Sequence, residues 1–417
     1  MNIWKDTYPL IVSCARGLVP QVIQELTTLG YEVVDSTEQT AVVRGTMRDM
    51  MRLNLHLRTA HRVLVPLLRT ECHYLEDFYD DVISIDWENL LDTDGYFTIS
   101  SVTRTLAIRD TRIVALKAKD AIADRMRQRC GGRPDSGSET FGAAVFIYWI
   151  ESEMIVYIDT TGEPLSKRGY RKLPGPAPMQ ETLAAGCVLA SGWEGKTPFV
   201  APMCGSGTPA IEAALIAINR APGSFKSHFA FMAIKGYRIT IPGEQAGTSV
   251  RQRFGASPEQ IWKDMVATAR QQERHQGLPP IIASDIDPEA VETAQMNAIA
   301  AGVSEHITFA TCDFARTRLP PPPGVIFMNP EYGERLGEGE DLTPMYVRIG
   351  DFLKQQGTGY TGCVLTGNME MSRKIGLRSS RRIPFFNGPI ECRMIVFELY
   401  GDKQDVADQE PEETDEW

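Results

Sequence analysis

Three clusters of residues in the second half of the chain have the types and spacing needed to hold a nucleotide-like ligand. A glycine-rich turn follows the apolar stretch at residues 198–201, and Asp285 and Asp313 follow two further apolar stretches. Glycines at the carboxyl end of a buried parallel strand let a ligand approach the backbone, and an acid at the next strand end can accept both ribose hydroxyls. A polar side chain at a third strand end can meet an adenine amino group. The residues expected to contact this ligand are Pro202, Cys204, Gly205, Ser206, Gly207, Thr208, Asp285, Asp313 and Asn329.

The apolar stretch at residues 325–328 runs into Asn329-Pro330-Glu331-Tyr332. By itself, Asn-Pro could be only a turn signal. Beside a glycine turn and a ribose acid it predicts a pocket for an exocyclic amine, because the Asn329 side-chain oxygen and the Pro330 carbonyl can accept both N–H bonds of an NH₂ group. Tyr332 could stack on the base that carries this amine. Asn329, Pro330 and Tyr332 are therefore the predicted catalytic residues.

The spacing of these clusters disfavours other nucleotide-binding sites. Gly195-Lys196-Thr197 is not a phosphate-binding loop, since it lacks the glycine five positions earlier. A dinucleotide fold usually places its acid about 20 residues after the glycines, whereas 78 residues separate Gly207 from Asp285. A nicotinamide-dependent oxidoreductase is thus an alternative that the spacing disfavours.

The histidines at 56 and 61 have no third ligand nearby, and no metal site is predicted.

The pattern of apolar residues predicts an α/β fold in which a Rossmann-like domain follows an α+β module. Beyond residue 179, short apolar strands alternate with helices, which indicates a parallel sheet covered on both faces. The first 60 residues alternate as strand, helix, strand, strand, helix and strand, the order of a ferredoxin-like unit. The expected units are 1–60 (ferredoxin-like), 61–160 (a second α+β unit), 161–178 (linker), 179–401 (Rossmann-like) and 402–417 (disordered acidic tail).

Composition excludes several classes of protein. Of the 417 residues, 43% are hydrophobic and 23% are charged, as in ordinary globular proteins. No apolar stretch is long enough to span a bilayer, and none resembles a signal peptide. The eight cysteines are never closer than 17 residues apart, so neither a zinc knuckle nor a dense disulfide framework is expected. We expect a reduced, cytoplasmic protein with no membrane contact.

The net charge of −11 does not decide whether the partner is a nucleic acid. The tail from Asp402 to Trp417 holds eight carboxylates and one lysine. Residues 100–134 hold nine Lys or Arg against three acids, and residues 372–382 hold five and no acid. Local patches, not the total, govern phosphate binding. The charge is therefore neutral on an RNA partner.

Together these motifs resemble class I S-adenosylmethionine-dependent RNA methyltransferases with a THUMP domain, and above all the bacterial enzymes that methylate guanine N2 in large-subunit (23S) rRNA. The segments that carry this resemblance are 161–171, 178–185, 202–208, 284–288, Asn297-Ala298, Ala301-Gly302 and 329–335, and the similarity covers most of the chain. Two positions depart from the family pattern: Ala201 stands where the family normally has Asp, and Glu331 stands where it normally has a second proline.

The resemblance implies S-adenosylmethionine as cofactor, a THUMP RNA-binding domain over 61–160, and RNA as partner, with 23S rRNA favoured and tRNA possible. The residues that we expect to contact RNA are Arg104, Arg109, Arg112, Lys117, Lys119, Arg168 and Arg171. Two alternatives within this fold stay open: a guanine-N2 methyltransferase acting on tRNA, and a catalytically weakened RNA-binding or ribosome-assembly factor.

Overall fold

The N-terminal part of the chain is built on a continuous eight-stranded sheet. The computed structural model describes residues 3–106, 108, 110–172, 179–238, 256–332 and 341–400. Within them, the strands of this sheet follow the order β2-β3-β1-β4-β8-β7-β5-β6. They are β1 (Tyr8–Cys14), β2 (Val33–Ser36), β3 (Thr40–Gly45), β4 (Ala60–Glu71), β5 (Tyr96–Arg104), β6 (Asp135–Ser136), β7 (Ala143–Ile150) and β8 (Glu153–Asp159).

The long strand β4 joins the ferredoxin-like unit to the unit that follows it. Its first residues pair antiparallel with β1, and its later residues pair antiparallel with β8 from Leu64 onward. The register shifts between Pro66 and Leu68. A proline cannot donate to the strand ladder, and such irregularities bend a strand and increase its twist. One strand therefore belongs to both units, and their sheets are continuous.

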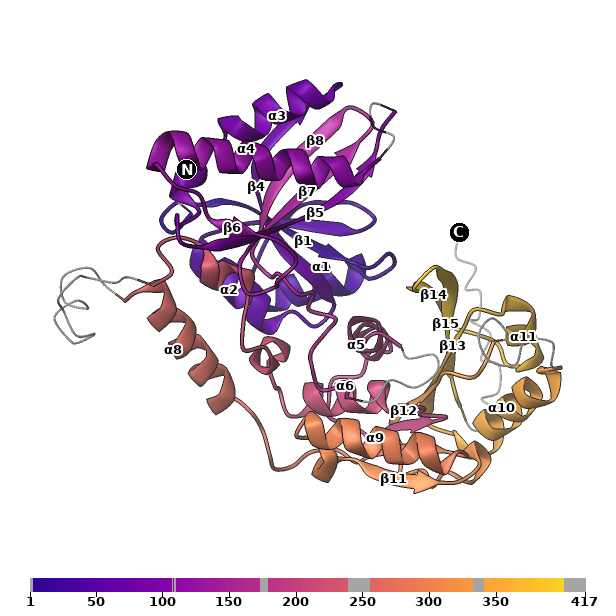
Figure 1. Cartoon of the computed structure of the whole chain (residues 1–417). Coiled ribbons are helices and arrows are strands. Elements are labelled where there is room, and N and C mark those ends of the chain that lie inside the picture. Colours follow the sequence, from indigo (N-terminus) through magenta and orange to yellow (C-terminus); the bar gives the residue numbers. More distant parts are fainter. Residues whose placement is uncertain are drawn as a thin grey trace, which may run out of the picture.

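Helices cover this sheet as the apolar spacing requires. The order β1-α1-β2-β3-α2-β4 confirms the predicted ferredoxin-like sequence of elements. Helix α1 (Val19–Thr28) buries Val22 and Leu26, four residues apart on one face. The other helices of this part are α2 (Met47–His56), α3 (Leu75–Ser84) and α4 (Arg112–Cys130). Helices α3 and α4 lie side by side over one face of the sheet (Figure 1), and α4 ends at Gly131 with φ +70°.

The C-terminal part is a seven-stranded sheet in the order β11-β10-β9-β12-β13-β15-β14. The strands are β9 (Phe199–Pro202), β10 (Ile281–Asp285), β11 (Thr308–Thr311), β12 (Gly324–Met328), β13 (Tyr360–Thr366), β14 (Arg381–Asn387) and β15 (Ile390–Glu398). Strands β9 to β13 are parallel, whereas β14 and β15 form an antiparallel hairpin. The strand order reverses between β9 and β12, and ligands bind open α/β sheets at such a point.

Helices on both faces of this sheet explain why its central strands are continuously apolar. Every residue of β9 and β12 is buried. The helices of this domain are α5 (Glu181–Ala190), α6 (Thr208–Ala217), α9 (Pro288–Ala300), α10 (Thr343–Gln356) and α11 (Met369–Lys374), whereas α8 (Pro258–Gln271) lies beside α2 of the N-terminal part (Figure 1). The expected Rossmann-like domain after an α+β module is thus confirmed. Helix α8 was not predicted; it packs through Trp262, whose ring centroid lies 5.2 Å from those of Phe229 and Phe231.

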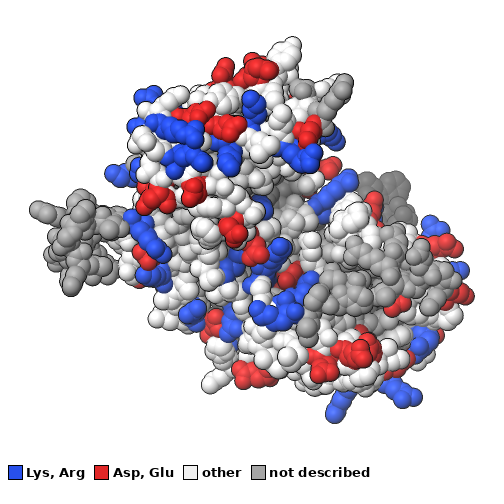
Figure 2. Space-filling view, in the orientation of Figure 1, with Lys and Arg blue, Asp and Glu red and all other residues white. Residues whose placement is uncertain are grey.

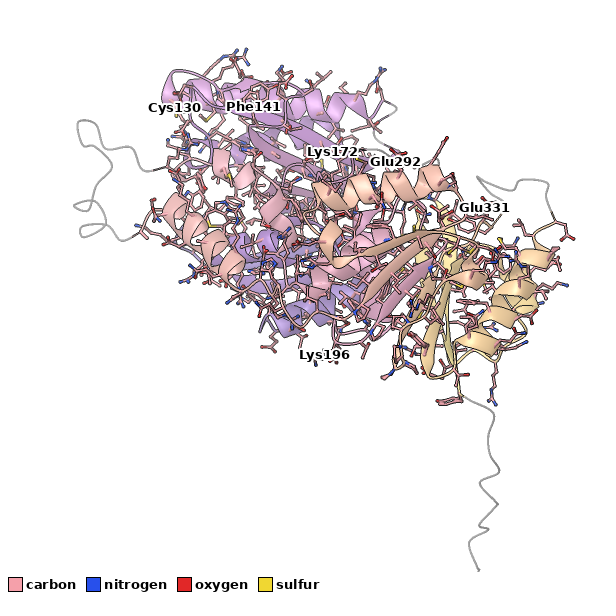
Figure 3. The ribbon with its side chains drawn as sticks, turned by 90° about the horizontal axis from the view of Figure 1, so that it is seen from below. Cys130, Phe141, Lys172, Lys196, Glu292 and Glu331 are labelled. Carbon is pink, nitrogen blue, oxygen red and sulfur yellow. The ribbon has the colours of Figure 1, made fainter. Side chains whose placement is uncertain are left out.

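A buried ion pair fastens the segment after the first sheet to the second domain. Arg168 is 2% exposed and Glu212 of α6 is fully buried, and the Arg168 Nε donates to Glu212 Oε1 at 2.7 Å. The Arg168 Nη2 also donates to the Arg58 carbonyl at 2.6 Å, and the Tyr170 hydroxyl donates to Glu212 Oε1 at 2.9 Å. The segment then reaches α9, where the Lys172 amide donates to Asn297 Oδ1 at 3.0 Å (Figure 3). Arg168, Tyr170 and Lys172 therefore tie this segment to helices α6 and α9 of the second domain.

Removing one partner of this pair should destabilise the protein strongly, because the other charge would stay buried and unpaired. We expect Arg168→Ala to lower the free energy of unfolding by about 3–5 kcal/mol, measured by urea denaturation. Lys196→Ala, which breaks an exposed pair with Glu194, is the control and should not move the midpoint. Replacing both buried partners, as Arg168→Met with Glu212→Leu, should recover part of the loss. A single variant as stable as the natural chain would contradict this role.

Candidate active site

A cavity of about 750 Å³ opens at the carboxyl edge of the second sheet, where the strand order reverses. Its walls come from the ends of β9, β10 and β12, from the residues after β11, and from helix α10. The predicted site residues that line it are Cys204, Gly205, Ser206, Thr208, Asp285, Asp313, Asn329, Pro330 and Tyr332. Residues from four strand ends, far apart in sequence, thus meet around one space.

The glycine turn after β9 has a backbone conformation that few residue types adopt. Met203, Gly205 and Gly207 have φ values of +65°, +51° and +81°. The turn is closed by the Gly207 amide, which donates to the Cys204 carbonyl at 2.9 Å. A methionine in the left-handed region is a local strain of the kind found at ligand-binding turns. Gly207 does not line the cavity; it begins α6 and packs against Ala294 of α9.

Asp285 holds this turn in place from the neighbouring strand. Its Oδ2 accepts a hydrogen bond from the Gly205 amide at 2.9 Å, and its Oδ1 accepts one from the Asp287 amide at 3.1 Å. Asp287 caps α9, since its side chain accepts from the Glu289 amide at 2.9 Å. Each carboxylate oxygen of Asp285 can accept a further hydrogen bond. The acid can therefore position the glycine turn and still face a ligand in the cavity.

Asp313 is already paired with an arginine that the sequence did not reveal. The Arg348 Nη2 on α10 donates to both Asp313 oxygens at 2.7 Å. This hydrogen bond lowers the pKa of the Asp313 carboxyl below its ordinary value. The Arg348 guanidinium also lies 4.9 Å from the centre of the Phe314 ring. Both Arg348 and Phe314 line the cavity, so this wall is an ordered ion pair beside an aromatic ring.

The Asn329–Tyr332 segment carries an unsatisfied acceptor into the cavity. The Asn329 Oδ1 is buried and has no hydrogen-bond partner among the described residues. Tyr332 is held by two asparagines: the Asn387 Nδ2 donates to its hydroxyl at 2.9 Å, and the Asn368 Nδ2 donates to its carbonyl at 3.5 Å. Buried acceptors without partners are rare in folded proteins and call for an explanation. A donor group on a bound ligand would satisfy this one.

Burial raises the pKa of the Cys204 thiol well above its ordinary value. This cysteine therefore stays a neutral thiol and is not suited to nucleophilic attack.

The residues described include no group of three or more His, Cys, Asp or Glu that could hold a metal ion. No described helix is long and apolar enough to cross a membrane.

Several cavity residues escaped prediction from the sequence. Met203, which was not among the expected contacts, lines the cavity. Glu331, noted in the sequence as a departure from the family pattern, lies exposed at its wall (Figure 3). Phe314 could have been inferred because it directly follows Asp313. Nothing in the sequence points to Arg348, which lies 35 residues beyond Asp313 on a separate helix. Pro202, a predicted ligand contact, ends β9 beneath the turn and does not line the cavity.

The residues predicted to contact RNA differ in their exposure to solvent. Arg104 and Arg112 are exposed, and Lys117 and Lys119 are half-buried on α4, while Arg109 lies outside the described residues. The prediction is wrong for Arg168, whose guanidinium is buried in the ion pair with Glu212. It is also wrong for Arg171, whose side chain is 15% exposed and pairs with Glu181 at 3.1 Å. Both arginines serve packing around α5 and α6, and proximity in sequence to a basic stretch could not reveal this.

The fold and the cavity define a class I methyltransferase with ferredoxin-like and THUMP domains before it. Family models match the chain as an RlmL ferredoxin-like domain over residues 9–64, a THUMP domain over 72–159, and an RMKL-like methyltransferase domain over 168–395. The last match alone covers more than half of the chain. The protein belongs to the RMKL-like methyltransferase family.

Curated relatives are similar over nearly all of the chain. A ribosomal RNA large subunit methyltransferase K/L of Methylococcus capsulatus is 33% identical over 94% of this chain and 51% of its own length. A Synechocystis sp. protein, slr0064, named provisionally as an RNA methyltransferase, is 32% identical over 94% of this chain and 97% of its own. The chain thus spans about half the length of the K/L relatives that it matches.

Solved structures share the whole architecture. The crystal structure of SMU.472 complexed with SAH is 26% identical, with a TM-score of 0.81 over 96% of this chain and 100% of that one. A Listeria monocytogenes structure, titled a predicted N6-adenine-specific DNA methylase, is 27% identical, with a TM-score of 0.79 over 94% and 97% of the two chains.

Two glycine substitutions should separate ligand binding from folding. At Gly205 an added Cβ would meet no atom within 4 Å, whereas at Gly207 it would lie 2.8 Å from the Ala294 Cβ. We expect Gly205→Ala to cost about 1–2 kcal/mol of folding free energy and to weaken S-adenosylmethionine binding by tenfold or more, because the methyl group occupies space at the cavity wall.

Gly207→Ala carries the same backbone cost and an added steric clash with α9. We expect it to lower the free energy of unfolding by about 1–3 kcal/mol more than Gly205→Ala does. Thermal unfolding and calorimetric titration of both variants check this. If Gly205→Ala binds the cofactor as the natural chain does, the turn is not the ligand cradle.

Proposed function

We propose that this protein transfers a methyl group from S-adenosylmethionine to the exocyclic N2 of guanine in 23S rRNA. The observation that carries the proposal is the unpaired Asn329 Oδ1 in a cavity that also holds the glycine turn and Asp285. The names of the K/L relatives specify large-subunit rRNA, and the SMU.472 structure contains SAH. The RNA substrate and its identity are taken from these relatives.

The cofactor would occupy the part of the cavity beside the glycine turn. In this proposal Asp285 accepts the ribose hydroxyls with the lone pairs that the Gly205 and Asp287 amides leave free. Asp313 meets the adenine amino group, and Phe314 provides an apolar surface next to it. When bound, the cofactor supplies an electrophilic methyl group on a sulfonium. These residues fit such a ligand because they combine exposed backbone, a carboxylate at the second strand end and an aromatic side chain.

The acceptor amine would be held by Asn329 and Pro330. Their carbonyl oxygens accept its two N–H bonds, which directs the nitrogen lone pair away from them and toward the methyl carbon. The N–C bond forms as the C–S bond breaks, and the extra proton on nitrogen leaves to solvent. Tyr332, fixed by Asn387 and Asn368, stacks on the flipped-out base. Alignment and polarising hydrogen bonds would supply most of the catalysis.

Glu331 favours guanine over adenine as the acceptor base. The Watson–Crick edge of guanine presents two adjacent donors, N1–H and the N2 amine, whereas adenine presents an acceptor at N1. The exposed Glu331 carboxylate lines the cavity next to Asn329 and Pro330. It could accept from guanine N1–H and would repel adenine N1. Glu331 in place of the family proline therefore fits guanine as the acceptor base. The similar Listeria monocytogenes structure, in contrast, is described as a predicted N6-adenine-specific DNA methylase.

Ala201 favours a second candidate, a catalytically weakened RNA-binding factor of the same fold. It lines the cavity where the family normally has a carboxylate, so the cofactor has lost one charged partner. The same chemistry on tRNA is the third candidate.

Transfer of labelled methyl groups from S-adenosylmethionine to unmodified total RNA separates these candidates. N2-methylguanosine in large-subunit rRNA would support the proposal. Label in tRNA would retain the chemistry and change the substrate, and N6-methyladenosine would contradict the role of Glu331. RNA binding without methyl transfer or cofactor binding would favour the weakened factor.

Asn329→Ala should remove the acceptor role and leave the fold intact. We expect methyl transfer to fall at least about a hundredfold, the scale for one hydrogen-bond partner of a transition state. Cofactor affinity, measured by calorimetry, should change little because the glycine turn and Asp285 are untouched. Asn368→Ala, which loosens Tyr332 from a distance, is the matched control and should have a smaller effect. Equal activity of Asn329→Ala and the natural chain would exclude the assigned role.

A further inference from the structure

Tyr346 of α10 is a fully buried residue whose hydroxyl reaches the backbone of the proposed acceptor pocket. The hydroxyl donates to the Glu331 carbonyl at 3.1 Å and lies 2.7 Å from the hydroxyl of Thr366, the last residue of β13. Burial raises the pKa of Tyr346 to about 12, so the hydroxyl keeps its proton at neutral pH. A carbonyl can only accept, and the Tyr346 proton is therefore used on Glu331.

The hydrogen bonds around Tyr346 form a chain with one direction. Because the Tyr346 proton points to the Glu331 carbonyl, the Tyr346 oxygen accepts from the Thr366 hydroxyl. The Thr366 oxygen in turn accepts from the Asn368 amide at 3.0 Å. Every donor thus points toward residues 329–332, called here the acceptor segment. Hydrogen bonds joined in such a chain polarise and strengthen one another.

The next carbonyl of the acceptor segment is held by the same loop. The Asn368 Nδ2 donates to the Tyr332 carbonyl at 3.5 Å, while its Oδ1 accepts from the Met371 amide at 3.1 Å at the start of α11. Two consecutive carbonyls, those of Glu331 and Tyr332, are therefore fixed from β13, α10 and α11. This fixes the backbone directly after Pro330.

Helix α10 also contacts the wall that is proposed to hold the adenine. Two residues after Tyr346, Arg348 pairs with Asp313, and at the end of the helix the Gln356 Nε2 donates to the Ala315 carbonyl at 2.8 Å. One helix therefore contacts both the cofactor wall and the acceptor segment. It sets the separation between the methyl donor and the base that receives the methyl group.

A purely stabilising role is the alternative, since a buried tyrosine normally finds a hydrogen-bond partner. Tyr360, the first residue of β13, is such a case. It is buried in the same core cluster as Tyr346, and its hydroxyl donates to the Pro320 carbonyl. Neither Tyr360 nor Pro320 lines the cavity, whereas Glu331 does. The partner of its hydroxyl thus sets Tyr346 apart from Tyr360.

We propose that Tyr346 is a positioning residue for methyl transfer, which holds the acceptor segment at the distance and angle that in-line attack requires. Figure 2 shows basic and acidic side chains interspersed on one face of the molecule. Mixed charge of this kind does not orient a single base, so alignment depends on short-range contacts in the pocket. A displacement of about 1 Å can cost about a hundredfold in rate. The inference rests on the proposed function for the reaction that Tyr346 assists.

Tyr346→Phe and Tyr360→Phe are a matched pair, because each removes one buried hydroxyl that donates to a backbone carbonyl. The single-turnover rate of methyl transfer to unmodified, transcribed 23S rRNA is measured with the full chain in excess. For Tyr346→Phe we expect a rate at least about tenfold lower, with the Kd for S-adenosylmethionine changed by less than about twofold. Tyr360→Phe should keep its rate within about twofold, although both unfolding midpoints fall by similar amounts. Equal loss of rate in the two variants would overturn the proposal.

Two substitutions of Thr366 test the chain itself. Thr366→Val removes the donor to Tyr346 and the acceptor of the Asn368 amide, whereas Thr366→Ser keeps both. We expect Thr366→Val to lower the single-turnover rate at least about threefold and Thr366→Ser to retain it, because each bond of the chain supports the next. Equal rates for the two Thr366 variants would contradict the chain.

Amide hydrogen exchange decides the inference without the reaction. The peptide that contains residues 329–332 should exchange at least about threefold faster in Tyr346→Phe than in the natural chain, and at the natural rate in Tyr360→Phe. If the natural chain methylates no RNA, the proposed function fails, and this comparison still decides whether Tyr346 fixes the acceptor segment. If the natural chain methylates RNA and Tyr346→Phe keeps its rate and its exchange, the positioning role is refuted and the function stands. A lower rate with unchanged cofactor affinity and faster exchange would support both.

Discussion

The buried pair of Arg168 and Glu212 is the constraint on which the relation between the two halves depends. Two charges out of water are tolerated only when each is fully hydrogen-bonded. Here Arg168 and Tyr170 both donate to the Glu212 carboxylate of α6, and Arg168 also donates to the Arg58 carbonyl. Helix α6 starts at Gly207, so the element that fixes the N-terminal module also carries the ligand turn. The same network therefore sets the position of the ferredoxin-like and THUMP domains relative to the glycine turn.

Hydrogen bonds between the polar residues of the candidate active site fix its shape before any ligand binds. Asp285 holds the Gly205 amide, Arg348 holds Asp313, and the two asparagines hold Tyr332. Helix α10 connects two of these walls, because it carries Arg348 and also Tyr346, whose hydroxyl donates to the Glu331 carbonyl at 3.1 Å. Pre-ordered groups reduce the reorganisation needed at the transition state. The unsatisfied Asn329 oxygen stands out because its neighbours are satisfied.

The number of Lys and Arg residues in a stretch of this protein does not show how many of them form ion pairs with carboxylates. The stretch at residues 100–134 has the most basic residues. Arginines of α4 in it form ion pairs with Asp86 and Glu88, which follow α3, or with Asp124 of α4 itself. The shorter stretch near residue 378 has fewer cations and none of these partners. Within the described residues, Arg104, Lys117, Lys119 and Arg133 of the longer stretch also form no ion pair, so only the arginines of α4 differ in this way from the cations near residue 378.

The sequence by itself determined the order of elements, the parallel sheet and the strand ends that meet at the site, because apolar runs, glycines and strand-end acids are local signals. It also indicated Asp285, Asn329 and Tyr332, since each lies at the end of an apolar strand or within four residues of it. Only the tertiary structure decided that Arg168 is a buried ion-pair partner, that Arg348 pairs with Asp313, and which individual cations of the basic stretches form ion pairs. These properties depend on contacts between residues tens of positions apart, and an arginine has the same appearance in sequence whether it faces a carboxylate or water.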